Sequence, residues 1–370
     1  MTRWSVFITA ESDLLLPQVP GGGNETRSLP YIPGSVLRGA LASRHVLRPG
    51  DVPDPAFLAT YCSPDVIFID AFPFTDSGAV HRLPLSARTC KRRPGFRPLG
   101  ANTTDGNVSH GVWDEFEDGR VECPACSASL EPCSGWWYYA DRESNELKRW
   151  EGTLRQESHT EIEDDTGHAK EGVLFTELRI PRGRKFAGEI RVLTDHPTPK
   201  EFLSLPVNAS INLYVGRRGG RVSVEWATED RDPAQDVDGL RENDIVKLVL
   251  RSPAIVEDDF GRPLRRFDAQ TLAALLGRTQ DDGVGLEYLG QQYSAPHWVH
   301  GWNAAHGMPK ARELALAAGS CAAFSVRDQA EAATSLRTLL HRGGGFRTNE
   351  GFGQVAMNPP FFTQEAGDGQ

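Results

Sequence analysis

Four of the six cysteines lie in one stretch of the chain, and their spacing could hold a metal ion. Cys123 and Cys126 form a C-x-x-C turn (CPAC), which can direct two thiolates at one tetrahedral ion, and Cys133 follows seven residues later. Cys90 is the best candidate for the fourth ligand, with His110 as the alternative. We therefore predict a structural zinc ion bound by Cys90, Cys123, Cys126 and Cys133.

Two other interpretations of these cysteines stay open. A C-x-x-C pair can be a thioredoxin-like redox site, although this pair lacks the strand-to-helix setting of such sites, and thiols can also be inert. A catalytic zinc ion needs an open coordination position, which four thiolates do not leave. Cys62 and Cys321 are predicted to be buried free thiols.

Two stretches far apart in the chain join glycine turns to basic or polar side chains. They are residues 31–42 (YIPGSVLRGALA) and residues 343–357 (GGGFRTNEGFGQVAM). Such turns expose backbone N–H groups where an anionic chain can lie. We interpret the two stretches as opposite ends of a duplicated scaffold for a phosphate chain, with a similar arginine-bearing turn at residues 216–221 between them.

The net charge argues against a protein that coats duplex DNA without sequence preference. The chain has 40 basic and 50 acidic residues, a net charge of -10, whereas such binding depends on neutralising phosphates. Basic residues are nevertheless clustered, in runs that include Lys91 to Arg93 and Arg217 to Arg221. A surface polarised in this way could bind nucleic acid on one side and a protein partner on the other, or the runs could be ordinary solvated faces.

Length and composition indicate a globular protein of two domains. The 370 residues are 39% hydrophobic and 24% charged, and glycine (37) and proline (25) favour a fold rich in turns and strands. No window has the length and apolar character of a membrane span, and the N-terminus lacks the apolar core of a signal peptide. We expect a cytoplasmic protein that does not bind membranes.

The elements that must position these residues repeat along the chain. Residues 3–10 alternate like a half-buried strand, and Ser35 is the expected N-cap of a helix that runs to about Leu47. Further strands are expected at residues 66–71, 174–180, 189–193, 211–215 and 221–227. After an acidic linker at residues 229–238, the order strand (244–250), helix (268–276), strand (321–326), helix (328–341), glycine loop, strand (354–357) fits a ferredoxin-like α+β unit.

This pattern predicts two degenerate copies of one fold. The first domain would span residues 1–230, with a zinc-binding insert at about residues 85–160, and the second would span residues 240–370. The predicted fold class is therefore α+β, with two tandem ferredoxin-like (RRM-like) domains.

Four segments carry a resemblance to a known family: IPGSVLRGALA, HTEIEDDTGHAKEGVLFTELRIP, GWNAAHGMPKARELALAAGS and RTNEGFGQVAMN. Together they resemble the RAMP superfamily of CRISPR-associated proteins, over most of the chain outside the insert. The tandem units and the cysteine-containing insert are most similar to the subunit of type III-D effector complexes that caps the 5′ end of the crRNA. The resemblance implies a structural role in antiviral defence, with crRNA, RAMP backbone subunits and a large polymerase-like subunit as partners.

A protein that holds a single-stranded guide RNA irrespective of its sequence needs three kinds of group. These are backbone N–H groups and cations that bind phosphates, and aromatic rings that stack on bases. Phe346 and Phe352 could stack on bases or pack in the core. The candidate RNA-binding residues are Gly34, Ser35, Arg38, Lys91, Arg92, Arg93, Arg217, Arg218, Arg221, Arg342, Gly344, Gly345, Arg347, Asn349 and Gly351.

An enzymatic role is the alternative. Some RAMP proteins cut repeat RNA without a metal ion, using a histidine as general acid or base. The spacing marks no pair among His45, His81, His159, His168, His300 and His306, and no G-x-S-x-G elbow of a serine hydrolase occurs. We therefore expect a non-catalytic RNA-binding scaffold, and a zinc-stabilised adaptor that contacts only protein is a third possibility.

Overall fold

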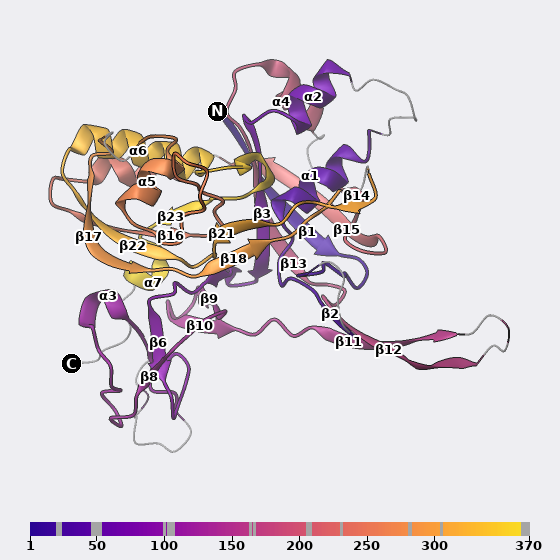
Figure 1. Ribbon diagram of the computed structural model, residues 1–370, viewed down its shortest axis with the longest axis horizontal. Helices are drawn as coiled ribbons and strands as arrows, with labels where there is room; N and C mark the ends of the chain where they lie inside the picture. Colours follow the sequence, from indigo (N-terminus) through magenta and orange to yellow (C-terminus); the bar gives the residue numbers. More distant parts are fainter. Residues whose placement is uncertain are drawn as a thin grey trace.

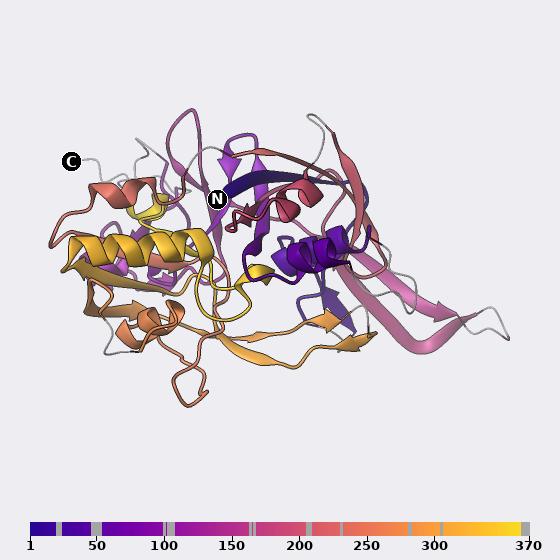
Figure 2. The same cartoon turned by 90° about the horizontal axis from the view of Figure 1, so that it is seen from above.

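The computed structural model describes residues 1–19, 24–45, 54–98, 101, 108–162, 165, 168–204, 209–229, 232–279, 283–303 and 306–363 (Figure 1). The fold is mixed α+β and made mostly of strands. Two main sheets, each with its own helices, form a first and a second unit that lie side by side (Figure 2). An insert of short strands extends from the first unit.

The first unit is built on a six-stranded sheet. Its strands lie in the order β14 (Ile211–Val215), β15 (Gly220–Thr228), β1 (Thr2–Ala10), β13 (Lys185–Val192), β3 (Val66–Thr75) and β4 (Gly78–Ala79), and all neighbours are antiparallel. Helices α1 (Gly34–Ala42), α2 (Pro55–Tyr61) and α4 (Pro197–Leu203) belong to this unit. In chain order, β1, α1, β3, β13, α4 and β15 form a β-α-β-β-α-β series whose strands have the spatial order 4-1-3-2.

The second unit repeats this connectivity with a four-stranded antiparallel sheet. Its order is β17 (Leu286–Tyr293), β22 (Cys321–Val326), β16 (Ile245–Leu250) and β23 (Val355–Met357). Helix α5 (Ala269–Leu275) follows β16, and α6 (Gln329–Arg342) connects β22 to β23. Read from β23 to β17, the strands again have the order 4-1-3-2.

Each unit has its own hydrophobic core. In β1, Trp4, Val6, Ile8 and Ala10 are buried while Phe7 is 42% exposed, as the alternation of the sequence predicts. The core of the second unit joins β16 and β22 to α6, through residues such as Leu248, Phe324 and Leu336. Burial of these apolar faces is the main force that holds each helix on its sheet.

The insert consists of two small sheets. One has the order β10 (Leu147–Trp150), β9 (Trp137–Ala140), β5 (His81–Arg82), and the other has the order β7 (Val112–Asp114), β6 (Ala87–Cys90), β8 (Leu130–Pro132), followed in chain order after β7 by α3 (Glu115–Asp118). Lys247 of β16 donates a 2.8 Å hydrogen bond to Asp114, which ties the insert to the second unit.

Two hairpins extend beyond the main sheets. Strands β11 (Arg155–Ile162) and β12 (Ala169–Arg179) form a long arm that projects from the first unit (Figure 1), and β2 (Glu25–Arg27) pairs with its base. In the second unit, β18 (Pro296–Val299) pairs with β21 (Glu313–Leu316), and β19 (Trp302–Asn303) pairs with β20 (Met308–Pro309). The remaining elements are η1 (Gln235–Gly239), η2 (Thr348–Glu350) and α7 (Pro360–Thr363).

The predicted elements are found with shifted boundaries. Helix α1 begins at Gly34, its N-cap position is Pro33 without a side-chain cap, and it ends at Ala42, so the prediction that Ser35 caps this helix was wrong. Leu47 lies outside the described residues. The predicted acidic linker contains η1, and its Val237 is buried in the second core, so part of this segment is structural.

Helix α1 lies so close to β3 that only glycine fits at position 34. A Cβ atom at Gly34 would overlap the carbonyl oxygen of Phe68, whereas a Cβ atom at Gly39 of the same helix meets nothing within 4 Å. We expect Gly34→Ala to lower the free energy of unfolding by about 3 kcal/mol. Gly39→Ala should raise it by about 1 kcal/mol, because alanine is the better helix former. Chemical denaturation followed by circular dichroism measures both, and similar effects of the two changes would contradict this packing.

Candidate functional site

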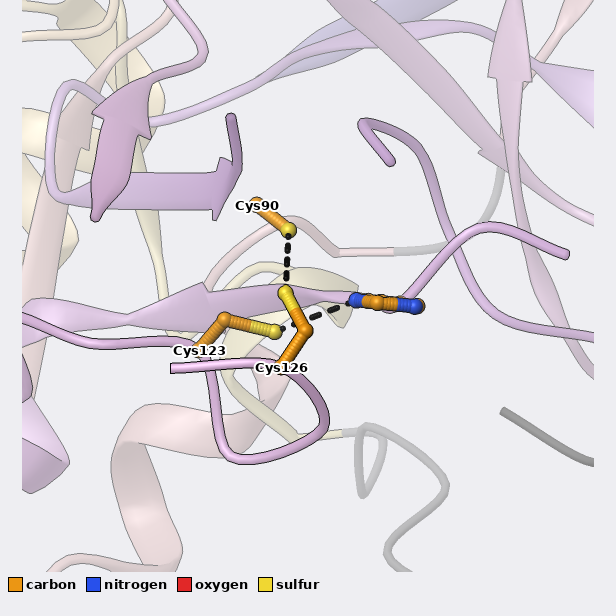
Figure 3. A group of neighbouring side chains, drawn as sticks. Cys90, Cys123 and Cys126 are labelled. Atoms are coloured by element: carbon orange, nitrogen blue, oxygen red, sulfur yellow. Dashed lines mark hydrogen bonds between the residues drawn. The ribbon is translucent and has the colours of Figure 1, made fainter. Parts of the chain in front are cut away.

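Three cysteines and one histidine converge in the insert. The ligand atoms of Cys90, His110, Cys123 and Cys126 all lie within 4.8 Å of one another (Figure 3). The Cys90 and Cys126 sulfur atoms are 3.6 Å apart, and Cys123 Sγ lies 3.3 Å from His110 Nδ1. Three thiolates and one imidazole form a donor set typical of structural zinc sites, so these four residues could hold a metal ion.

The insert sheet positions the four ligands. Cys90 is the last residue of β6, and His110 lies just before the neighbouring strand β7, which begins at Val112. Cys123 and Cys126 lie in a tight turn, in which the Ser127 N–H donates a 2.8 Å hydrogen bond to the Cys123 carbonyl oxygen. A hydrogen bond from the Ala128 backbone lowers the pKa of the Cys126 thiol, while burial raises the pKa of the Cys123 thiol to about 11.

The cluster contains His110 and not Cys133, which the sequence analysis had placed in the ligand set. Cys133 is buried in a separate apolar cluster with residues such as Leu83, Ala87 and Tyr138, and burial raises the pKa of its thiol to about 12. The strand β8 passes from the turn to this cluster, which carries Cys133 away from the other three cysteines. The prediction of buried thiols is confirmed for Cys321 and wrong for Cys62, which is exposed.

The two glycine-containing stretches meet each other, at a contact that we call the junction: α1 and β3 of the first unit against η2 of the second. The N–H of Gly34 donates a 2.8 Å hydrogen bond to Asp70 Oδ1, and a Cβ atom at Gly34 would lie 3.0 Å from the Glu350 carbonyl oxygen. A Cβ atom at Gly351 would lie 2.8 Å from the Phe68 carbonyl oxygen and 2.9 Å from Asp70 Oδ1. The prediction that the stretches lie at opposite ends of a scaffold was therefore wrong.

Glu350 collects three cations at the junction. Its carboxylate accepts hydrogen bonds from Arg38 (3.2 Å), Lys310 (3.0 Å) and Arg347 (2.7 Å), and Arg347 also bonds Glu313. Burial alone would raise the pKa of Glu350, but the bond from Arg347 and the charges of all three cations outweigh burial and lower it. Two of the predicted RNA-binding arginines, Arg38 and Arg347, are thus tied to one carboxylate.

The glycine loop uses its backbone donors internally. The N–H groups of Gly344, Gly345 and Gly351 bond the carbonyl oxygens of Gly353, Leu275 and Thr348. Because a Cβ atom at Gly344 would come within 2.6 Å of the Leu275 carbonyl oxygen, glycine permits close packing here. These N–H groups, like that of Gly34, already have acceptors within the chain, and RNA binding by these residues stays a prediction.

The other predicted RNA-binding side chains lie at several places on the surface. Arg217, Arg218 and Arg221 are exposed at the turn between β14 and β15, and Arg218 also lies 3.4 Å from Glu177. Lys91 pairs with Glu131 at 3.2 Å, Arg342 pairs with Asp65 at 2.7 Å, Arg92 is exposed, and Arg93, Ser35 and Asn349 are half-buried.

The two aromatic rings of the loop differ. Phe352 is half-buried and lies 4.7 Å from the Arg347 guanidinium carbon, whereas Phe346 is 53% exposed. Phe346 is therefore the ring with surface available for a base.

One cluster was missed by the sequence analysis. Pairing of β11 with β12 sets Glu157 opposite Glu177, and His159 Nε2 lies 3.3 Å from Glu177. Arg179 lies within 3.2 Å of both carboxylates, which makes the group an ion-pair network at the base of the arm. Its alternating E-x-H spacing in residues 157–159 was the only available signal.

Comparison with known proteins identifies the class. Residues 134–359, more than half of the chain, match the family model described as CRISPR-associated protein (Cas_Cmr3). The chain is therefore a CRISPR-associated, RAMP-like type III protein. It belongs to the Cas_Cmr3 family.

Similarity to other known proteins is distant. A chain in the cryo-EM structure of the type III-B Cmr-beta complex bound to cognate target RNA and AMPPnP is 12% identical, with a TM-score of 0.41 and 86% of each chain covered. Cas6 from Thermus thermophilus is 14% identical, with a TM-score of 0.29, and 47% of this chain and 75% of that chain are covered. No curated protein matches the sequence.

Among the described residues, no helix is long and apolar enough to cross a membrane.

The ion pairs of Glu350 predict a pH-dependent stability. Because the pKa of Glu350 is lower in the folded than in the unfolded chain, its charge stabilises the fold above its unfolded pKa, and this contribution is lost as the pH falls through the folded pKa. We expect Glu350→Gln to cost about 3 kcal/mol at pH 7 and progressively less below about pH 5. Denaturation at several pH values measures this, with the exposed Glu143→Gln as the control. A cost that does not depend on pH would contradict the role of the charge.

Proposed function

We propose that this chain is a non-catalytic RNA-binding and scaffolding subunit of a type III CRISPR effector complex, which holds the 5′ end of the crRNA and docks neighbouring subunits. The observation that carries the proposal is the Cas_Cmr3 family match, which extends from the insert through the second unit. The chain in the Cmr-beta complex to which this protein is similar comes from a multi-subunit assembly bound to target RNA, which is consistent with the proposal.

The connectivity supports two tandem ferredoxin-like domains. Both main sheets have the β-α-β-β-α-β series with strand order 4-1-3-2, the arrangement that names this fold. In RRM domains, sheets of this kind recognise RNA, because single-stranded RNA binds across the exposed face of the β-sheet. Two such units joined at the junction would offer a longer path for a guide than one unit alone.

The surface charges favour a sequence-independent grip on the RNA backbone. Arg217 and Arg221 are exposed at the end of a hairpin, where a backbone can approach them. At the junction, the carboxylates that pair with Arg38, Lys310 and Arg347 in the described part of the chain are Glu350 and Glu313, so cations exceed anions in these ion pairs. An RNA phosphate would be a third anion for this group.

RNA binding by the hairpin arginines is testable. We expect the double change Arg217→Ala and Arg221→Ala to weaken binding of single-stranded RNA and to lower the slope of log K against log salt by about 1.4, or about 0.7 for each lost phosphate contact. Fluorescence anisotropy across a salt series measures the slope. The matched control is Arg262→Ala, an exposed arginine that pairs with Asp258 of its own loop.

The same preparation tests the absence of catalysis. Labelled repeat RNA incubated with the protein in EDTA should stay intact. If the protein makes site-specific cuts, and one His→Ala change abolishes them, the scaffold proposal is wrong. The alternative function, a metal-independent RAMP endoribonuclease, would then be supported. If the hairpin variant and the Arg262→Ala control have equal salt slopes, the hairpin arginines do not contact the RNA backbone.

We also propose that Cys90, His110, Cys123 and Cys126 hold a structural zinc ion. Four protein ligands complete the tetrahedral coordination of a zinc ion, so no coordination position would be left for a substrate. The ion would crosslink β6 to the turn before β8. The insert has only small apolar clusters, and a metal crosslink is a common means of stabilising such a segment.

The histidine ligand separates this site from the set predicted from sequence. We expect about one zinc ion per chain in the wild type, and both less zinc and a lower Tm in His110→Ala. Cys133→Ala should keep its zinc, because Cys133 lies outside the cluster. Mass spectrometry of the metal content, with thermal melts alongside, measures both. Zinc lost from Cys133→Ala but retained in His110→Ala would restore the four-cysteine set.

A further inference from the structure

A small cavity lies where the first unit, the insert and the second unit meet. Phe72 of β3 lines it from the first unit, Tyr138 of β9 from the insert, and Leu250 and Ala356 from β16 and β23 of the second unit. The cavity is partly open to solvent and has a volume of ≈ 30 Å³, more than the space that one water molecule needs. It therefore has room for a compact group and not for a nucleotide.

Two arginines from different parts of the fold line this cavity. Arg82 comes from β5, and Arg251 follows directly after β16. Among the residues that the structure describes, no carboxylate lies within 4.0 Å of either guanidinium. Arg82 Nε is buried without a hydrogen-bond partner. Each guanidinium instead lies near an aromatic ring, Arg82 at 5.8 Å from Trp137 and Arg251 at 5.2 Å from Phe72.

The carboxylates near this pair of arginines already have other partners. The negative charges of Glu189 and Asp70 act on Arg251, but Glu189 is bonded by Arg3 and Arg191. Asp70 accepts the Gly34 N–H, and burial raises the pKa of its carboxyl group to about 7 although the Gly34 bond and the charge of Arg251 lower it.

The histidine beside the arginines adds no charge at neutral pH. Burial lowers the pKa of His81, which also lines the cavity, to about 4. Buried charges in folded proteins are normally paired, so two guanidinium groups without a carboxylate in direct contact among the described residues favour the binding of an anion.

We propose that the Arg82 and Arg251 cavity binds a single phosphate group. Guanidinium groups match the oxygens of phosphate with two parallel N–H donors, and Arg82 Nε is a free donor for such a pair. The neutral His81 ring and the Tyr138 hydroxyl, both in the lining, can supply further hydrogen bonds. The group comes either from free phosphate or from the end of an RNA chain, and bound there it links the two units to the insert.

Thermal melts of the full chain in sodium phosphate and in sodium chloride, at equal ionic strength and pH, test the site. At a phosphate concentration about ten times Kd, we expect phosphate to raise the Tm of the wild type by about 3 °C. The shift should vanish in Arg82→Gln and Arg251→Gln and persist in the control Arg262→Gln. In chloride, Arg82→Gln should melt at or above the wild-type Tm, because it removes a half-buried cation whose Nε is buried without a hydrogen-bond partner.

Two results would overturn the proposal: no shift in the wild type, or the same shift in the wild type and Arg82→Gln, which would be a general salt effect. If Arg251→Gln fails to fold, Arg82→Gln alone decides, because its readout is the difference between two buffers for one protein. The phosphate buffers contain no RNA, so this result is independent of the proposed RNA binding.

The source of the group is found with a short oligoribonucleotide that carries either a 5′-phosphate or a 5′-hydroxyl. Extra stabilisation by the phosphorylated form alone, lost in Arg82→Gln, assigns the site to an RNA end. Stabilisation by inorganic phosphate with no difference between the two oligonucleotides assigns it to the free ion.

Discussion

The close contact between β3 and the glycine residues of two distant segments determines how the whole molecule is assembled. Strand β3 presents the Phe68 carbonyl oxygen and the Asp70 side chain to both Gly34 and Gly351. A Cβ atom would lie only 1.8 Å (Gly34) or 2.8 Å (Gly351) from the Phe68 oxygen, which no side chain would allow. Once these backbones touch, Glu350 is brought within reach of Arg38, and Arg191 reaches the last carbonyl groups of α6. The second unit is therefore positioned by backbone contact, and the ion pairs then fix its orientation.

The insert is held at both of its ends by different means. Near the main sheets, Lys247 reaches Asp114 and lies over the rings of Phe116 and Phe362, so a charge from the second unit is shielded by apolar groups of the insert and the C-terminal segment. Away from them, the cluster of Cys90, His110, Cys123 and Cys126 joins segments with little apolar surface. The cavity with Arg82 and Arg251 is lined by residues of the first unit, the insert and the second unit, so a ligand there would touch all three parts of the fold.

The sequence predicted local structure better than it predicted contacts. Alternating residues in β1 and the helical repeat in α6 both specify a buried face, and the C-x-x-C turn specifies two converging thiols, because these patterns depend only on near neighbours. The bond between Arg38 and Glu350 joins residues 312 positions apart, and nothing local records it. The replacement of Cys133 by His110 depends on the path of β8, and the burial of the glycine N–H groups depends on which carbonyl oxygens fold against them.

The central place of β1 has a consequence for how the chain is made. Strand β1 pairs on one side with β13 and on the other with β15, so both of its partners lie between residues 185 and 228. During synthesis, β1 leaves the ribosome before the other strands of its sheet, yet it is among the last of them to find neighbours, and such long-range pairing is slow. The insert emerges in the meantime, and its local turn of Cys123 and Cys126 can form while β1 is still unpaired. The sheet of the first unit is thus completed only after the insert has been synthesised.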